Sequence, residues 1–205
     1  MNINNIQNPQ WNLYNSEYLP NKEDEELEYE YRSRLRRGYA FSVIDNQSLT
    51  RIASFIQQNG NQVIDIGAGT GYHAALLTQL GIHVMAFDIM PYNNNYCQAE
   101  LEFYPVHQFD GGTITAQYPN HIPWLSWIDN RNERYVYEAL ANTQSNVFIY
   151  VGGGYGGGDA SPTLLNDIRK QWVMDTNEII LPSFYPVDSD EIESFIRVYH
   201  RKKSK

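Results

Sequence analysis

The stretch that decides the fold is Val63–Asp88, which reads VIDIGAGTGYHAALLTQLGIHVMAFD. A short apolar run is followed by three spaced glycines, a helix-like segment closing near Gly81, and a second apolar run. We expect a strand over 63–66, a glycine turn, a helix and a second strand ending at Asp88. Apolar strands joined through a helix belong to a parallel sheet that is covered on both faces. The sequence therefore predicts an α/β fold.

The glycine turn and the acid before it indicate what kind of ligand fits. A turn that leads straight into a helix needs backbone angles that glycine adopts and a backbone that a ligand can approach. A dinucleotide-binding turn would place its third glycine one residue later, where this chain has Tyr72. Asp65 would repel a pyrophosphate, and burying it is costly unless a cation or a donor meets it. These two residues argue against a nucleotide-dependent oxidoreductase, whereas the ammonium of an amino-acid-like ligand would be attracted.

A second acid completes a recognisable pattern. Asp88 follows the first glycine by about twenty residues, where a carboxylate can accept hydrogen bonds from ribose hydroxyls. The segment 65–71, DIGAGTG, followed by Asp88, resembles the first two motifs of the class I S-adenosylmethionine-dependent methyltransferases. The resemblance implies that Asp65 and the glycines lie against the methionine part of the cofactor and that Asp88 holds its ribose. It also implies a three-layer, Rossmann-like fold with a mostly parallel seven-stranded sheet and an antiparallel last strand.

The same resemblance implies further contacts to S-adenosylmethionine. Tyr39 and Phe41 precede a helix and are candidates to cover the methionine end of the cofactor, and Tyr92 could lie against the adenine. Asp110 ends the third expected strand, where related enzymes bind the adenine amino group, although Asp-Gly is also a common turn dipeptide. The cofactor-binding residues that we predict are Tyr39, Asp65, Gly67, Ala68, Gly69, Gly71, Asp88, Ile89, Asp110 and Ser126.

We predict a fourth strand over 121–127, and we expect the molecule that receives the methyl group to bind beyond its end. In an open α/β sheet the ligand lies beyond the carboxyl ends of the strands, here between the first and fourth strands. Asp129 and Asn130 are therefore the catalytic candidates. Related enzymes that methylate amino groups often carry two prolines in this loop, whereas this chain has Trp127-Ile128-Asp129-Asn130. The departure leaves a second hypothesis open, in which the protein binds the cofactor without transfer and acts through a partner.

The remaining elements complete the expected sheet. We predict a third strand over 104–109, a fifth over 147–151 and a terminal hairpin of 178–184 and 194–200. A helix over 132–142, in which Tyr135, Ala139 and Leu140 are available to pack, precedes the fifth strand, and Ser161-Pro162 is a typical helix start. The glycine-rich run 152–158 is either a mobile flap near the substrate or a loop without a role.

Composition limits the remaining possibilities. A length of 205 residues with 42% hydrophobic residues suits one domain, with residues 1–60 as an arm and helices over the cofactor site and 61–205 as the core. A net charge of -9 argues against a partner such as duplex nucleic acid. We infer no metal, because Cys97 is the only cysteine and no two histidines have helical metal-site spacing. No membrane span or signal-like segment is seen, so we expect a cytoplasmic protein, with acceptor and oligomeric state left open.

Overall fold

The computed structural model describes most of the expected core. The described residues are 40, 42, 44, 46–91, 102–153, 159–181 and 194–203. The expectations for Tyr39, Phe41, Tyr92, Cys97 and the centre of the glycine-rich run lie outside them. Most of the predicted arm, 1–60, does so as well, and the division of the chain at residue 60 stays a prediction.

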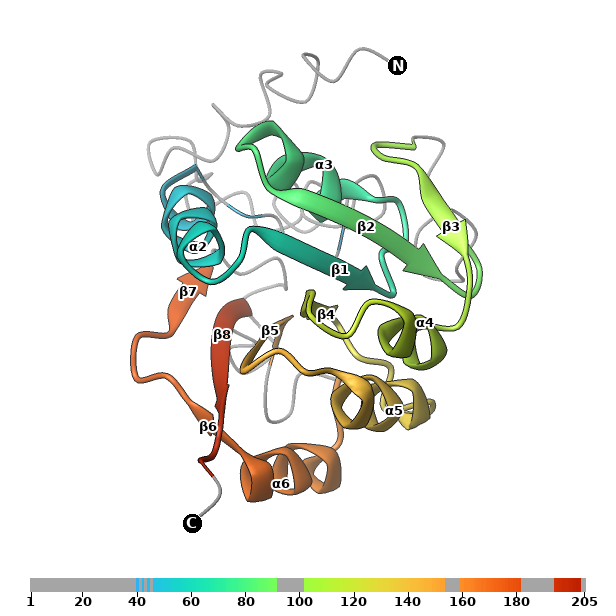
Figure 1. Ribbon diagram of the computed structural model, residues 1–205, viewed down its shortest axis with the longest axis vertical. Coiled ribbons are helices and arrows are strands. Elements are labelled where there is room, and N and C mark those ends of the chain that lie inside the picture. Colours follow the sequence, from blue (N-terminus) through green and yellow to red (C-terminus); the bar gives the residue numbers. More distant parts are fainter. Residues whose placement is uncertain are drawn as a thin grey trace, which may run out of the picture.

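One mixed sheet organises the molecule (Figure 1). Its strands lie in the order β3-β2-β1-β4-β5-β8-β6, and β7 also pairs with β8. Neighbouring strands from β3 to β5 are parallel, whereas β8 runs antiparallel to β5. The predicted α/β fold with a mostly parallel sheet is thus confirmed. The strands are β1 Gln62–Ile66, β2 His83–Asp88, β3 Val106–Gln108, β4 Ile122–Ser126, β5 Val147–Gly152, β6 Trp172–Met174, β7 Ile179–Leu181 and β8 Ser194–Arg201.

The predicted count of seven strands is corrected to eight within the described residues. The outer partner of β8 is built from two short strands, with Met174 of β6 opposite Tyr199 and Ile179 of β7 opposite Ile196. Both are antiparallel to β8. Between them the four residues 175–178 lie opposite two residues of β8, 197–198, which makes a bulge, although the Asp175 amide still donates to the Val198 carbonyl over 2.8 Å. A three-residue strand such as β6 is too short to show an alternating pattern, which is why the sequence did not reveal it.

Helices cover both faces of the sheet and give the predicted three layers (Figure 1). One apolar cluster joins one face to α2, Asn46–Gln58, and α3, Tyr72–Gln79. A second cluster joins the other face to α4, Gly111–Gln117, α5, Arg134–Asn142, and α6, Pro162–Gln171.

The sequence explains how the two faces are assigned and where a helix begins. Along β1, Val63 belongs to the first cluster and Ile64 and Ile66 to the second, as alternation in a strand requires. Ser161 caps α6 by accepting the Leu164 amide, as predicted. None of the helices within the described residues is long and apolar enough to span a membrane.

Candidate functional site

The glycine turn lies between β1 and α3, at the carboxyl end of the sheet. Gly67, Gly69 and Gly71 have φ angles of 77°, 55° and 75°, a left-handed conformation that favours glycine. A Cβ atom placed on Gly67 would have the Tyr135 hydroxyl oxygen as its nearest non-adjacent neighbour among the described residues, 4.0 Å away. Among the described residues no closer atom fills the space beside Gly67, while its contact with a cofactor stays a prediction.

Gly71 has a different role in the structure. A Cβ atom at this position would lie 2.8 Å from the Cβ and the carbonyl oxygen of Tyr104. The adjacent Phe103 amide donates to the Thr70 carbonyl over 3.0 Å, so this segment packs directly on the turn. Gly71 is therefore required by packing, and its contact with a cofactor stays a prediction.

Asp65 is a buried carboxyl group without a hydrogen-bond partner. It is only 1% exposed, and neither of its carboxyl oxygens has a partner among the described residues. Burial raises the pKa of Asp65 to about 8, and the negative charge of Asp88 adds to the shift. An unpaired buried carboxylate is costly, so this position is suited to a ligand that brings a cation or several donors.

Asp88 holds the glycine turn to the end of β2. Its Oδ2 accepts the Gly69 amide over 2.9 Å, and its Oδ1 accepts the Met90 amide over 2.7 Å. Because each carboxylate oxygen has two lone pairs, both can accept a further donor. Ile89 and Met90 follow Asp88 in the chain, and the Phe109 amide donates to the Asp88 carbonyl over 3.0 Å. All three residues carry exposed apolar side chains. This edge offers two acceptors beside an apolar surface.

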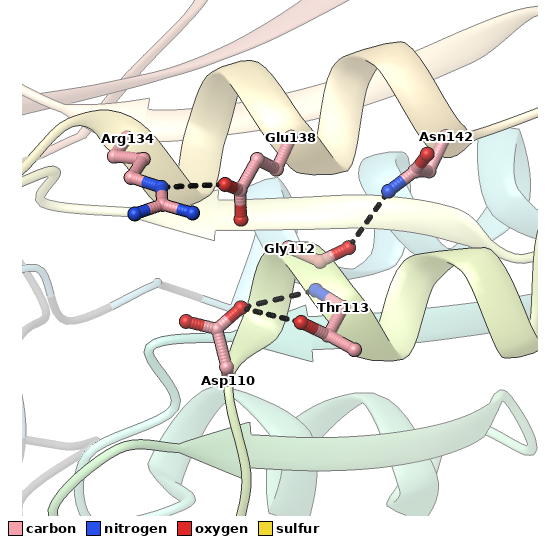
Figure 2. Close-up of polar contacts among 6 residues, drawn as sticks. All are labelled: Asp110, Gly112, Thr113, Arg134, Glu138 and Asn142. Carbon is pink, nitrogen blue, oxygen red and sulfur yellow. Dashed lines mark hydrogen bonds and ion pairs between the residues drawn. The ribbon is translucent and has the colours of Figure 1, made fainter.

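Asp110 acts as the N-cap of α4 (Figure 2). Its Oδ1 accepts the Thr113 amide over 3.0 Å and the Thr113 hydroxyl over 3.2 Å. The following Gly111 lies so close to β1 that a Cβ atom would come within 2.0 Å of Ile66 Cγ2. The Asp-Gly pair therefore starts a helix packed tightly against β1 and α5, while a contact between Asp110 and adenine stays a prediction.

The loop after β4 holds the two catalytic candidates. Both carboxylate oxygens of Asp129 accept hydrogen bonds from the Arg131 guanidinium, each over 2.9 Å. The Arg131 and Asp129 side chains are 67% and 41% exposed, and Asn130 is exposed as well. The structure thus places Asp129 in a surface ion pair, and the catalytic assignment of these two residues stays a prediction.

A buried hydrogen-bond network fixes the start of this loop. Trp127 follows Ser126 with a left-handed φ of 47°, and its indole N–H donates to Ser42 Oγ over 2.5 Å. Ser42 Oγ donates to Ser194 Oγ over 3.1 Å. The His73 ring pairs through Nε2 with the Ser42 carbonyl at 2.7 Å. Three segments far apart in sequence are thereby tied to the end of β4.

His73 is neutral in this network. Its Nδ1 accepts the Trp124 indole N–H over 3.4 Å, so the proton lies on Nε2 and is donated to Ser42. Burial lowers the pKa of His73 to about 4. The side chain is therefore a structural donor within this network.

Asp159, at the end of the glycine-rich run, was not identified from the sequence. Its Oδ2 accepts the Tyr150 hydroxyl and, over 3.0 Å, the Gly153 amide. A Cβ atom at Gly152 would lie 2.1 Å from this oxygen, so the glycine permits the contact. Asp159 Oδ1 is buried without a partner in the described part of the chain, and burial raises the pKa of Asp159 to about 6.

An acid lies at or after the carboxyl end of every one of the first five strands. These acids are Asp65, Asp88, Asp110, Asp129 and Asp159. Within the described ranges, no three His, Cys, Asp or Glu side chains are grouped so that they could hold a metal ion. Carboxyl groups gathered at one edge favour a ligand that carries positive charge.

Known proteins resemble this chain in structure. No protein-family model matches it, and no curated protein sequence matches it. The magnesium protoporphyrin IX methyltransferase of Synechocystis, solved with bound S-adenosylmethionine, aligns over 97% of this chain and 94% of its own at 12% identity, with a TM-score of 0.54. The chain has the fold of a class I methyltransferase.

Two further structures extend this likeness. An O-methyltransferase of Bacillus cereus in complex with S-adenosylhomocysteine covers 94% of this chain and 96% of its own, at 13% identity and a TM-score of 0.50. A putative O-methyltransferase of Klebsiella pneumoniae covers 95% and 98%, at 9% identity and a TM-score of 0.52. At such identities the likeness establishes the methyltransferase fold, and the chemistry must be argued from the site.

Proposed function

We propose that this protein is an S-adenosylmethionine-dependent methyltransferase. The observation that carries the proposal is the buried, unpartnered carboxyl group of Asp65 beside a glycine turn with open space at Gly67. The cofactor is a cationic nucleoside, and its ammonium group would supply the donors that Asp65 lacks. The neighbours solved with S-adenosylmethionine and S-adenosylhomocysteine support this choice of ligand.

The residues at the turn fit the two ends of the cofactor. Asp65 would hold the ammonium of the methionine part, and Asp88 would accept the ribose hydroxyls with its remaining lone pairs. The exposed apolar side chains of Ile89 and Phe109 would lie along the adenine. Ala68 and Ser126 are proposed as contacts because they border the turn and the end of β4.

The chemistry would be a direct displacement at the methyl group bound to the sulfonium. The bound cofactor supplies the activated methyl group, so the protein mainly aligns the acceptor in line with that carbon and excludes water. Asp129 and Asn130 would face the acceptor, a small molecule or a macromolecule, and Asp129 could hold a proton if the acceptor is a hydroxyl or a carboxyl group. The alternative of binding without transfer is not favoured, because the neighbours are described as methyltransferases.

Calorimetry tests this proposal directly. We expect the protein to bind S-adenosylhomocysteine and not NADH, and a radiolabelled methyl-transfer screen then separates an enzyme from a cofactor-binding protein. Binding of NADH with no binding of S-adenosylhomocysteine would overturn the proposal.

The Asp88→Ala variant tests the ribose assignment. Loss of a hydrogen-bonded carboxylate should weaken S-adenosylhomocysteine binding by about 1 to 3 kcal/mol, which is about tenfold to a hundredfold. Asp167→Ala is a suitable control, because Asp167 lies on α6 in an exposed pair with Lys170 and should leave affinity unchanged. An Asp88 variant with the wild-type dissociation constant would contradict the assignment.

A further inference from the structure

Tyr135 brings a hydroxyl group from α5 to the glycine turn. Its ring packs against the apolar cluster that contains Ile66 and Val136. Its hydroxyl oxygen is the nearest neighbour of the open position beside Gly67, at 4.0 Å from a Cβ placed there. This side chain was expected from the sequence only as a packing residue. The structure instead places its polar end at the edge of the ligand space.

The backbone amides of the turn are already engaged. The Gly67 and Ala68 amides donate to the Phe87 carbonyl over 2.9 and 3.1 Å. The Gly69 amide donates to Asp88, and the Gly71 amide donates to the Ala68 carbonyl over 2.8 Å. A turn of this kind often binds anions through such amides. Here these four are not available, so an anionic group of a ligand must find another donor.

The charges that act on the Tyr135 hydroxyl are all negative. Burial raises its pKa, and the carboxylates that add to this shift are Asp88, Asp129, Glu133 and Asp159. The phenol therefore keeps its proton well above neutral pH and remains a hydrogen-bond donor. It makes no hydrogen bond to any other described residue. A protonated hydroxyl that no described residue accepts is thus held near several carboxylates.

We propose that Tyr135 is the specificity-determining donor for the carboxylate at the amino-acid end of the ligand. The inference rests on the proposed function, because that ligand carries an ammonium group and a carboxylate on one carbon. If Asp65 takes the ammonium, the carboxylate on the same carbon would face the turn, where four backbone amides already have acceptors and nearby acids would repel it. The Tyr135 hydroxyl offsets this repulsion with a directed hydrogen bond.

The test compares two ligands and two tyrosines of the same helix. Tyr135→Phe keeps the ring packing and removes only the hydroxyl. Tyr137→Phe is the matched control, since its hydroxyl donates to Asp167 Oδ2 over 3.0 Å on an exposed surface. Binding of S-adenosylhomocysteine and of 5′-methylthioadenosine, which lacks the amino-acid end, is measured by calorimetry. Thermal unfolding of each variant verifies that the fold is retained.

We expect Tyr135→Phe to weaken S-adenosylhomocysteine binding about tenfold and to leave 5′-methylthioadenosine binding unchanged, as one hydrogen bond to a charged group requires. Tyr137→Phe should change neither. Equal losses for both ligands would assign the hydroxyl to the nucleoside and overturn the inference, and so would unchanged affinity for both. Wild-type protein that binds neither ligand would overturn the proposed function, and the inference with it.

Discussion

A protein in which Asp65 is replaced by Asn is expected to gain stability relative to the wild type as the pH rises from about 5 to about 7. Folding raises the pKa of Asp65 from 3.8 to about 8, so between these values the folded state carries a proton that the unfolded state lacks. The wild type then loses about 1.4 kcal/mol of unfolding free energy per pH unit through this residue. This loss of unfolding free energy ends above about pH 8, where Asp65 is ionised in both the folded and the unfolded state. The Asn variant does not show the loss, because its side chain does not ionise.

Denaturant unfolding at several pH values checks this expectation. Asp159→Asn is the matched control, because the pKa of Asp159 is raised only to about 6. The difference in unfolding free energy between this variant and the wild type should therefore stop changing near that pH. A constant stability difference between Asp65→Asn and the wild type across this range would show that Asp65 is paired in the folded protein.

The same substitution should weaken ligand binding strongly. An amide cannot neutralise an ammonium group. Because a charged hydrogen-bond pair is lost, the affinity of the variant for S-adenosylhomocysteine should fall about a hundredfold. In the wild type, Asp65 must release its proton when the ammonium binds, so affinity should rise by up to about tenfold per pH unit below pH 8. Calorimetry in buffers of different ionisation enthalpy would detect the released proton. Equal pH dependence in the two proteins would exclude Asp65 as the ammonium partner.

Replacing Gly111 with Ala should destabilise the protein by about 3 kcal/mol, near the upper end of the range for overpacking. The new methyl group would lie 2.0 Å from Ile66 Cγ2, at the contact between α4 and β1. Gly81→Ala is a useful contrast, because open space surrounds that position and only its positive φ of 78° opposes the change. We expect that contrast variant to lose about 1 kcal/mol. Thermal and denaturant unfolding would measure both losses.

A double-mutant cycle identifies the cause of this destabilisation. Ile66→Ala removes the Cγ2 atom that the new methyl would meet, so the double variant should be at least as stable as Ile66→Ala alone. Additive losses would show that the substitution acts elsewhere, for example on the N-terminal turn of α4.

The fold could be predicted because its decisive signals are local. The apolar runs and glycines of Val63–Asp88 specify a strand, a turn and a helix without reference to distant residues. The interrupted edge strand could not be predicted, because β6 and β7 are defined only by their pairing with β8. Short strands of this kind have little pattern of their own.

In the candidate site, too, the features set by local sequence could be predicted and those set by tertiary contacts could not. The cost of burying Asp65 follows from its position at the end of an apolar strand, and the structure indeed leaves it without a partner in the described residues. The packing role of Gly71 depends on Tyr104, and the surface pairing of Asp129 depends on the direction of Arg131. Such contacts are set by tertiary structure. The hydroxyl of Tyr135 was missed because its helix pattern indicated only burial.

The bulge between β6 and β7 has a consequence for the behaviour of the protein at high concentration. An unbroken edge strand presents a row of free amides and carbonyls that can template the addition of a strand from another molecule and so start aggregation. Here the row is interrupted by Asp175 and Glu178, whose carboxylates pair with His200 and Arg197 of β8. Charged interruptions of this kind are how natural sheets keep their edges from joining.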